Sequence, residues 1–374
     1  MNLQRIHISG YRSLRDFRLD LGQLMVVVGP NGSGKSNIYN GLALLAAAAV
    51  DGAFARRIAE EGGMASAMWA GPRRRNERAT IMIDARLEDI SYELVAGLEP
   101  PTQGYDYIDT HSEPEQQVSR FKLDPVIKEE RIRPSDAARS SALFERRGPA
   151  IFARDEEGRR QNWSLSVPDW ETGLATLRDP ERFPVLHVIR EELRAWRFYH
   201  HFRTDRHAAV RQPQIATRTP ILSHDGHDLA AAVQTIIEHG DAEHLQRTIM
   251  AAFDGAHVGV ESAAATHLEL KIHRPQIRRP FAAHELSDGQ LKFLCLAAAL
   301  LSPRPPSFMV LNEPEGSLHQ DLIGPLAELV LGAAEHSQIV VTTHSQVLAD
   351  ALSKTSVIKR VELVLEGGET KVKV

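Results

Sequence analysis

An eight-residue motif near the N-terminus constrains the fold of this chain more than any other feature. Residues 29–36 read GPNGSGKS and fit the pattern G-x-x-x-x-G-K-[ST]. The apolar run Leu24–Val28 precedes the motif and a helical pattern over Asn37–Val50 follows it, which is the context that the motif requires. A buried strand, a glycine-rich loop and a helix N-terminus together predict a phosphate-binding loop in an α/β protein.

The residue types of this loop suit a nucleoside triphosphate. Glycines allow backbone angles at which successive N–H groups turn toward one anion, and the helix that follows adds the positive end of its dipole. We expect Lys35 to reach the β- and γ-phosphates and Ser36 to place its hydroxyl on Mg²⁺. A plain glycine-rich turn is the alternative, and the flanking strand and helix argue against it. The predicted nucleotide-binding residues of the loop are Pro30, Asn31, Gly32, Ser33, Gly34, Lys35, Ser36 and Asn37.

Length and composition exclude several classes of protein. With 374 residues and 43% hydrophobic side chains, the chain can bury a substantial core. Its longest apolar runs, Leu42–Val50 and Phe293–Leu301, are far shorter than the roughly 20 residues needed to cross a bilayer. The N-terminus lacks the pattern of a signal peptide, and the single Cys295 excludes an internal disulfide. We therefore expect a cytoplasmic protein with no membrane partner.

Apolar periodicity predicts the other elements. Residues 3–9 and 13–21 alternate as an antiparallel hairpin, while prolines break residues 88–180 into β-like pieces that include VSRFKL, VIKEERIR and ALFERR. We expect an ATPase core from residues 1–87 and 266–374, with an inserted arm at 88–265 that is β-rich and then helical. Prolines exclude a long coiled coil there. Further helices are expected at 183–196, 228–239, 242–253, from 290 and at 322–334, and strands at 80–87, 267–273, 308–311, 339–342 and 357–365.

Three later segments carry chemistry-bearing residues. Residues 286–290 read LSDGQ before a helical run, where a serine hydroxyl and free N–H groups suit a second anion site, although an ordinary helix cap has the same pattern. The apolar run Phe308–Leu311 then leads into NEPEGSLH, and residues 340–345 read VVTTHS. The order of these segments after a phosphate-binding loop gives each of them more weight than it has alone.

Taken together, the segments resemble the signature, Walker B, D-loop and switch-histidine segments of the ATP-binding-cassette (ABC) ATPases. The EPE-x-x-LH variant and the GYRSL opening are similar to the RecF/SMC-like branch, and more narrowly to bacterial stand-alone RecF-type AAA-family ATPases. The resemblance covers residues 1–50 and 280–350. It implies a P-loop NTPase of ABC-ATPase type, with a mixed central sheet flanked by helices, an N-terminal antiparallel β element and an inserted arm.

The resemblance also implies roles for individual residues, with ATP and Mg²⁺ as cofactors. Glu313 would be the general base, His344 would sense the γ-phosphate beside Lys35, and Ser317 would lie in the D-loop between protomers. Arg12 would approach the phosphates or nucleic acid, with a plain surface arginine as the alternative. Contacts to ATP on a second protomer would come from Ser287, Asp288, Gly289 and Gln290.

The residue before the presumed base departs from the family pattern. Asn312 stands where an aspartate usually orders Mg²⁺ through a bound water. Its carbonyl oxygen can still accept a hydrogen bond from such a water but carries no negative charge. We therefore expect Ser36 as a direct metal ligand, Asn312 as a contact through water, and weak to moderate ATPase activity.

These residues favour an ATP-driven clamp that forms an ATP-dependent homodimer and acts on DNA, in repair or genome maintenance. A net charge of −5 provides no global attraction to nucleic acid, so contacts would come from local basic clusters such as 73–75, 159–160 or 278–279. The alternatives are a regulatory subunit for a separately encoded effector such as a nuclease in phage defence, a transporter subunit, and a sensor that binds ATP without hydrolysis.

Overall fold

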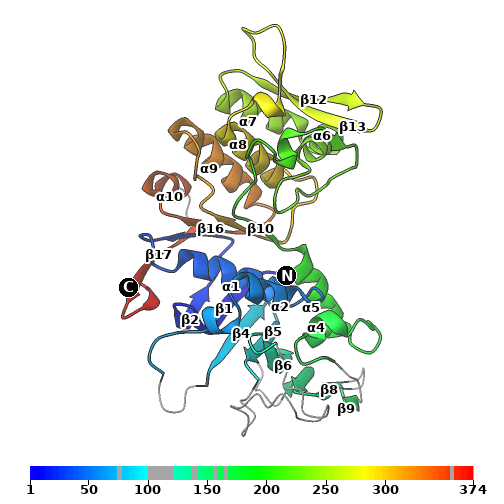
Figure 1. Ribbon diagram of the computed structural model, residues 1–374, viewed down its shortest axis with the longest axis vertical. Coiled ribbons are helices and arrows are strands. Elements are labelled where there is room, and N and C mark those ends of the chain that lie inside the picture. Colours follow the sequence, from blue (N-terminus) through cyan, green and yellow to red (C-terminus); the bar gives the residue numbers. More distant parts are fainter. Residues whose placement is uncertain are drawn as a thin grey trace, which may run out of the picture.

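The computed structural model describes residues 1–73, 78–99, 121–136, 141–154, 158–163, 167–353 and 358–373. A six-stranded sheet crosses the middle of the molecule and separates two layers (Figure 1). Its strand order is β10-β15-β16-β3-β17-β18, and all neighbours are parallel except β18, which pairs antiparallel with β17. The strands are β3 (Leu24–Val28), β10 (Arg197–Tyr199), β15 (Phe308–Asn312), β16 (Gln338–Thr343), β17 (Ile358–Glu366) and β18 (Glu369–Val372).

The central sheet is buried on both faces, as its continuous apolar runs predict. Along β3, Met25 and Val27 enter one hydrophobic core, while Leu24, Val26 and Val28 enter the other. This alternation follows from the two-residue period of a strand. The sheet therefore holds the loop that follows β3 at the boundary between the two layers.

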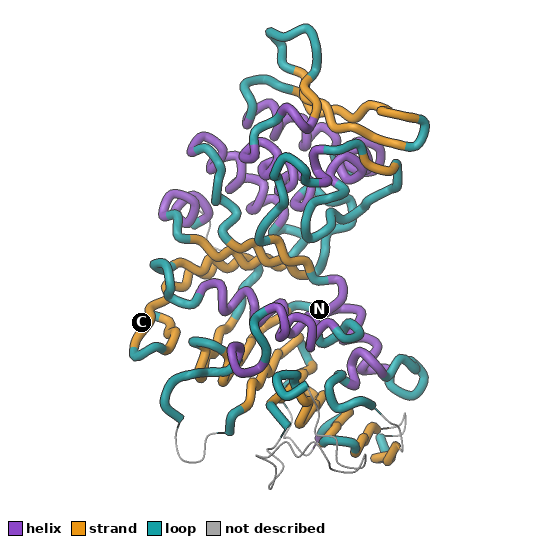
Figure 2. Tube along the Cα trace, in the orientation of Figure 1, coloured by secondary structure: helices purple, strands orange, loops and turns teal. Residues whose placement is uncertain are grey.

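Helices cover both faces of this sheet (Figure 2). On one face lie several helices, one of which begins at the signature segment. A small sheet of order β11-β13-β12, with β14 paired to β13, lies on the same face. On the other lie the helix after the phosphate loop and a second sheet. The first layer contains α6 (Leu229–His239), α7 (Ala242–Ala252), α8 (Asp288–Leu300), α9 (Ile323–Ala333), α10 (Gln346–Leu352), β11 (Gln214–Ile215), β12 (His257–Ala264), β13 (His267–His273) and β14 (Phe281–Ala282).

The second layer is built around an eight-stranded antiparallel sheet of order β2-β1-β4-β5-β6-β7-β8-β9. The predicted hairpin forms β1 and β2, and β1 pairs on its other edge with β4. The layer contains β1 (Leu3–Tyr11), β2 (Leu14–Asp20), β4 (Thr80–Leu87), β5 (Ile90–Gly97), β6 (Val126–Pro134), β7 (Phe144–Arg147), β8 (Ala150–Arg154), β9 (Arg160–Trp163), α1 (Lys35–Ala47), α2 (Ala53–Glu60), α3 (Met64–Ala67), α4 (Gly173–Thr176) and α5 (Pro184–Ala195).

Most predicted elements are confirmed, with ends that differ by a few residues. The pieces VIKEERIR and ALFERR lie in β6 and β7, whereas residues 118–120 of VSRFKL fall outside the described part of the chain and residues 121–123 form no strand. Several elements, most of them short, were missed in the sequence analysis: β5, β8, β9, β10, β11, β12, β14, β18, α2, α3, α4 and α10. The division of the chain into an ATPase core and an inserted arm at residues 88–265 stays a prediction. No helix in the described part of the chain is long and apolar enough to cross a membrane, and none of them forms a long coiled coil.

Candidate functional site

The predicted phosphate loop connects β3 to α1 at the carboxyl end of β3, an interior strand of the central sheet. Gly32 and Gly34 have φ values of 81° and 99°, in the left-handed region that glycine tolerates. Within the described residues, the N–H groups of Gly32, Gly34, Lys35 and Ser36 donate to no protein acceptor. Unpaired N–H groups at a helix N-terminus form a binding site for an anion. The loop therefore fits the phosphates of a nucleotide.

Lys35 is buried, with 4% of its surface exposed, and its ammonium group folds back onto its own loop. The Nζ atom donates to the carbonyl oxygens of Gly29 at 2.7 Å and Pro30 at 3.0 Å. Burial lowers the pKa of Lys35, and the nearby carboxylates of Glu313 and Glu315 oppose that shift. A cation held by two neutral carbonyls can exchange them for a phosphate with little movement.

The other loop residues divide into two groups. Pro30, Asn31, Gly32 and Ser36 are exposed, so they are open to a ligand. Ser33 is buried, and its Oγ atom has no hydrogen-bond partner within the described part of the chain. An unsatisfied buried hydroxyl is costly, so this atom suits a role with a bound group.

The C-terminal hairpin braces the phosphate loop. The Thr370 hydroxyl, on β18, donates to the carbonyl oxygen of Ser33 at 3.0 Å and lies 2.6 Å from Ser13 Oγ. Asn37 donates from its side-chain amide to the same Ser13 hydroxyl at 2.7 Å. A Cβ atom at Gly34 would collide with Thr370, which explains the glycine there. Asn37, predicted as a nucleotide contact, is thus tied to the β1–β2 turn.

Arg12 lies in the same turn, at a φ of 45°. Its Nε atom donates to Glu61 Oε2 at 3.0 Å, and the Tyr11 hydroxyl donates to the same carboxylate at 2.7 Å. Glu61 therefore balances the charge of Arg12. The predicted contact of Arg12 with a phosphate stays a prediction.

The acids and the histidine meet where two neighbouring parallel strands end. Residue Asn312 of β15 pairs with Thr342 of β16, so the residues after each strand lie together. The Nδ1 atom of His344 is 3.5 Å from Glu313 Oε1 and 3.6 Å from Glu315 Oε1. Glu315 is buried, and its Oε2 atom has no partner within the described residues. The fold thus brings Glu313 and His344 together.

Besides Arg12, two predicted functional positions, both after β15, have strained backbones. Glu313 has φ 49° and Ser317 has φ 66°, values uncommon for residues with a side chain. Such strain persists where the surroundings fix it, which is frequent at functional sites. Here Lys292 of α8 fixes the turn, because its Nζ atom donates to the carbonyl oxygens of Glu313 at 3.2 Å and Gly316 at 2.7 Å. Lys292 was not identified in the sequence analysis, because its spacing from Glu313 has no recognisable pattern.

Asn312 is almost fully buried, at 1% exposure, and both ends of its amide have partners. The Thr342 hydroxyl donates to its Oδ1 atom, and its Nδ2 atom lies 2.6 Å from His200 Nδ1. His200 follows β10, which runs parallel beside β15. His200 was not identified as part of this site in the sequence analysis. The water-mediated contact of Asn312 with Mg²⁺ stays a prediction, for which its oxygen retains a second lone pair.

The signature segment forms the exposed start of α8. Ser287 is the N-cap: its hydroxyl accepts from the backbone N–H of Gln290 at 3.3 Å, and its own N–H donates to the Gln290 side chain at 3.1 Å. Ser287 and Asp288 are exposed. A Cβ atom at Gly289 would lie 2.8 Å from the carbonyl oxygen of Ser317, so the segment packs closely on the D-loop of its own chain.

The residues fit magnesium better than a metal held by protein alone. Within the described part of the chain, no group of three histidine, cysteine, aspartate or glutamate side chains could hold a metal ion. Mg²⁺ keeps most of its waters and takes few protein ligands beside substrate phosphates. A site with one direct protein ligand, the exposed hydroxyl of Ser36, is compatible with that preference.

The sheet topology, the phosphate loop and the strand-end acids define this protein as a P-loop ATPase of the ABC type, with a fold similar to that of an SMC head. The chain belongs to the family described as "AAA domain, putative AbiEii toxin, Type IV TA system", which matches residues 24–350.

Other known proteins are similar to all or part of this chain. The phosphate import ATP-binding protein PstB of Malacoplasma penetrans (strain HF-2) is 32% identical over 89 residues, which cover 24% of this chain and 30% of that protein. The SMC head bound to the C-winged helix domain of ScpA has a TM-score of 0.51 at 14% identity, covering 100% of this chain and 98% of that one. The SMC head domain from Thermotoga maritima has a TM-score of 0.44 at 16% identity, with the same coverage. The likeness to the SMC head bound to ScpA shows the fold alone.

Proposed function

We propose that this protein is an ATP-hydrolysing molecular clamp that closes as a homodimer around two ATP molecules. Each phosphate loop would hold one ATP, and the Ser287–Gln290 segment of a second copy would cap it. The observation that carries the proposal is the pairing of two open anion sites in one chain. One is the set of unpaired N–H groups in the phosphate loop, on Gly32, Gly34, Lys35 and Ser36, and the other is the exposed N-terminus of α8.

The strand-end residues suit hydrolysis. Hydrolysis would cleave the phosphoanhydride bond between the β- and γ-phosphates of ATP. The γ-phosphate is the group that both protomers would contact. Lys35 would bind the phosphates, Ser36 would bind Mg²⁺, and Glu313 would take the proton of the attacking water. His344 lies 3.5 Å from the Glu313 carboxylate, so it can orient that base and contact the γ-phosphate. Because only ATP offers this shared phosphate, ATP would favour the closed state and hydrolysis would release it.

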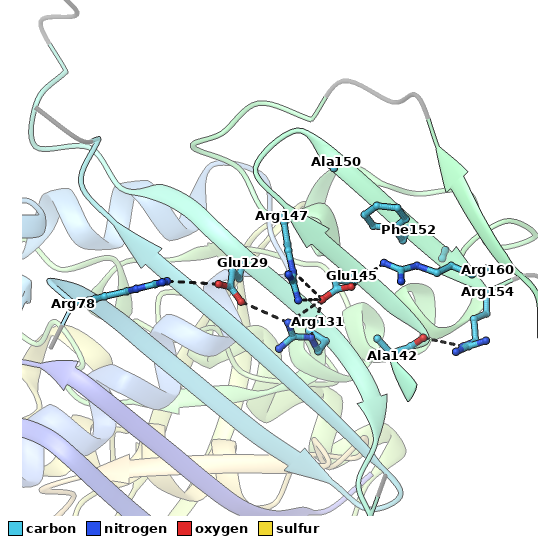
Figure 3. Close-up of a pocket in the computed structure, with 11 residues that line it drawn as sticks. Arg78, Glu129, Arg131, Ala142, Glu145, Arg147, Ala150, Phe152, Arg154 and Arg160 are labelled. Carbon is cyan, nitrogen blue, oxygen red and sulfur yellow. Dashed lines mark hydrogen bonds and ion pairs between the residues drawn. The ribbon is translucent and has the colours of Figure 1, made fainter. Parts of the chain in front are cut away.

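Contact with DNA is supported by an arginine-rich cavity of about 860 Å³ on the eight-stranded sheet (Figure 3). Five arginines and two glutamates line it. Glu145 lies at the centre and pairs with Arg131, Arg147 and Arg160. The lining residues are Arg78, Glu129, Arg131, Ala142, Glu145, Arg147, Ala150, Phe152, Ala153, Arg154 and Arg160.

The excess of positive charge in this cavity suits phosphates of a nucleic acid backbone. Arg147 and Arg160 remain 62% and 57% exposed although both contact Glu145, so their guanidinium groups keep free donors. Arg160 also lies over the Phe152 ring, at 4.1 Å. The cavity thereby provides a local basic surface in a chain whose net charge is −5.

The second candidate is an ATPase subunit that regulates a separately encoded effector. The family description names a putative toxin of a type IV toxin–antitoxin system, and this observation favours a role in defence over one in repair. Such a subunit would keep the ATP-dependent closure but would have little affinity for DNA. The two candidates therefore share the ATP site and differ in the partner.

Fluorescence anisotropy of a labelled DNA duplex tests the clamp on DNA. The Glu313→Gln protein with Mg-ATP should bind the duplex at least tenfold more tightly than without nucleotide. The double variant Arg147→Glu/Arg160→Glu should lose about tenfold in affinity and show a weaker salt dependence, because two phosphate contacts are gone. Arg203→Glu, which reverses an exposed arginine elsewhere, is the matched control. Equal, weak binding in all of these proteins would favour the regulatory subunit.

A further inference from the structure

Arg211 reaches the signature segment from a distant part of the chain. It ends the short turn Ala209–Arg211 and is 9% exposed. Its Nη2 atom lies 2.6 Å from Asp288 Oδ1, and its Nη1 atom donates to the carbonyl oxygen of Leu286 at 2.7 Å. Its Nε atom donates to the carbonyl oxygen of Thr204 at 2.7 Å. Every nitrogen of this guanidinium is used, and two of them are directed at the segment around Ser287.

Asp288 creates an electrostatic problem at this position. It is the first residue of α8, and its side chain is 65% exposed beside the Ser287 cap. A carboxylate at a helix N-terminus is stabilised by the helix dipole. The same carboxylate would repel any phosphate that approaches this end of the helix, because like charges a few ångströms apart disfavour each other. An anion site at Ser287 therefore needs the charge of Asp288 to be balanced.

The surroundings of Arg211 are cationic. It lines a cavity of about 620 Å³ next to the signature segment, whose lining includes two arginines, two histidines and no acid. The lining residues are Arg206, His207, Arg211, Gln212, Pro213 and His284. Asp288 thus pairs with a buried cation, and that cation also lines a cavity whose lining residues include a second arginine.

We propose that Arg211 is a positioning residue for nucleotide capping: by balancing Asp288, it makes the N-terminus of α8 acceptable to the γ-phosphate of ATP held by a second copy of this chain. The inference rests on the proposed ATP sandwich and adds a residue to it. Arg211 acts through Asp288 and through the Leu286 carbonyl, which fix the start of the helix. The segment Thr204–Arg211 thereby becomes part of the site, although it lies more than 75 residues before the signature in the sequence.

A purely structural role for Arg211 makes a different prediction. If Arg211 only holds the carbonyl oxygens of residues 283, 284 and 286, its loss harms the segment whatever side chain stands at position 288. If it balances a charge, removing that charge makes the arginine dispensable. The pair of variants Arg211→Gln and Arg211→Gln/Asp288→Gly separates the two roles. Glutamine keeps an amide donor for the carbonyls, so that the fold survives the loss of the charge.

The test measures the ATP-dependent dimerisation constant by analytical ultracentrifugation, with Glu313→Gln as the parent protein. Arg211→Gln should weaken dimerisation about tenfold, and adding Asp288→Gly should restore it to within about threefold of the parent. Arg203→Ala, in the same loop with its own partner Asp205, is the matched control and should equal the parent. Thermal unfolding of each variant checks its folding.

Three other results overturn the proposal. Dimerisation of Arg211→Gln at the strength of the parent would remove any role in capping. A double variant as weak as Arg211→Gln would assign Arg211 to structural support alone. A parent that stays a single chain with Mg-ATP would overturn the sandwich itself, and with it the role of Arg211. The first two results leave the sandwich intact, so the failures of the two proposals are distinguishable.

Discussion

The side-chain amide nitrogen of Asn312, the last residue of β15, lies 2.6 Å from Nδ1 of His200, which follows the adjacent parallel strand β10. The Thr342 hydroxyl holds the other end of the same amide. Asn312 is therefore oriented from both sides. It stands at the position where ABC ATPases usually have an aspartate. An amide fixed in this way can order a water on Mg²⁺ through its remaining lone pair.

The first prediction concerns the missing charge. Asn312→Asp should lower the Mg²⁺ concentration for half-maximal ATP hydrolysis by about three- to tenfold, because charge-assisted hydrogen bonds are about twice as strong as neutral ones. Thr342→Val removes a hydrogen bond to the same side chain without adding charge, so it is the control and should not lower the requirement. An unchanged Mg²⁺ requirement in Asn312→Asp would separate this residue from the metal.

The second prediction concerns Lys292, which fixes the turn that carries Glu313. Lys292→Met keeps the length of the side chain but leaves two carbonyl oxygens without their donor. Hydrolysis should fall on the order of tenfold, and the free energy of unfolding should fall by about 1–3 kcal/mol. Binding of a fluorescent ATP analogue to the phosphate loop should change less than about twofold, since that loop does not contact Lys292 in the described structure. Lys359→Met, on an exposed face of β17, should behave as the wild type. Full activity of Lys292→Met would show that the strained turn holds without it.

The third prediction concerns the brace on the phosphate loop. Thr370→Val preserves the shape of the side chain but removes the hydroxyl that bonds the Ser33 carbonyl and meets Ser13. ATP binding should weaken about three- to tenfold, the equivalent of one ordinary hydrogen bond. Thr370→Ser retains the hydroxyl and should bind ATP nearly as tightly as the wild type. Isothermal titration calorimetry measures both, and equal affinities of the valine and serine variants would contradict the role of the hydroxyl.

The fourth prediction is a pH dependence of stability at Glu130. This carboxylate is fully buried and accepts from the Tyr92 hydroxyl and from two backbone N–H groups at the start of α4. Burial raises the pKa of Glu130 above its ordinary value of 4.5, although those hydrogen bonds oppose the shift. A raised folded pKa contributes stability below the unfolded value, which is lost as the pH rises through the folded value.

Urea unfolding at several pH values tests this dependence. Relative to Glu130→Gln, which does not titrate, the wild type should lose free energy of unfolding as the pH rises from about 4.5 toward neutrality. The difference between the two proteins isolates Glu130 from the other titrating groups. If the wild type instead gains free energy of unfolding relative to Glu130→Gln as the pH rises, the pKa of Glu130 is lowered by folding, which would contradict the prediction.

Much of the fold could be predicted from the sequence because its signals are local. The phosphate loop lies between a five-residue apolar run and a helix, and Leu24–Val28 is a buried strand as expected. The N-cap at Ser287 also follows from its neighbours, since a serine three residues before glutamine forms a capping box. The positions of such residues depend on contacts within one turn of the chain.

The remaining contacts depend on pairings that a single sequence does not reveal. β10 has only three residues, so its periodicity is too short to predict a strand, and His200 could not be placed beside Asn312. Thr370 reaches Ser33 across 337 positions. Arg211 and Lys292 look like ordinary polar residues until the fold directs them at carbonyl oxygens. Long-range topology, rather than residue type, decides these contacts.

The mass of the Glu313→Gln protein in solution, measured by light scattering with and without Mg-ATP, is the most direct test of the ATP sandwich. Removing the base slows hydrolysis by about 10²–10⁴-fold and so traps the bound state. The ATP sandwich predicts a single chain without nucleotide and twice that mass with Mg-ATP, with no increase for Mg-ADP. A protein that binds ATP but keeps the mass of one chain at micromolar concentration would contradict it.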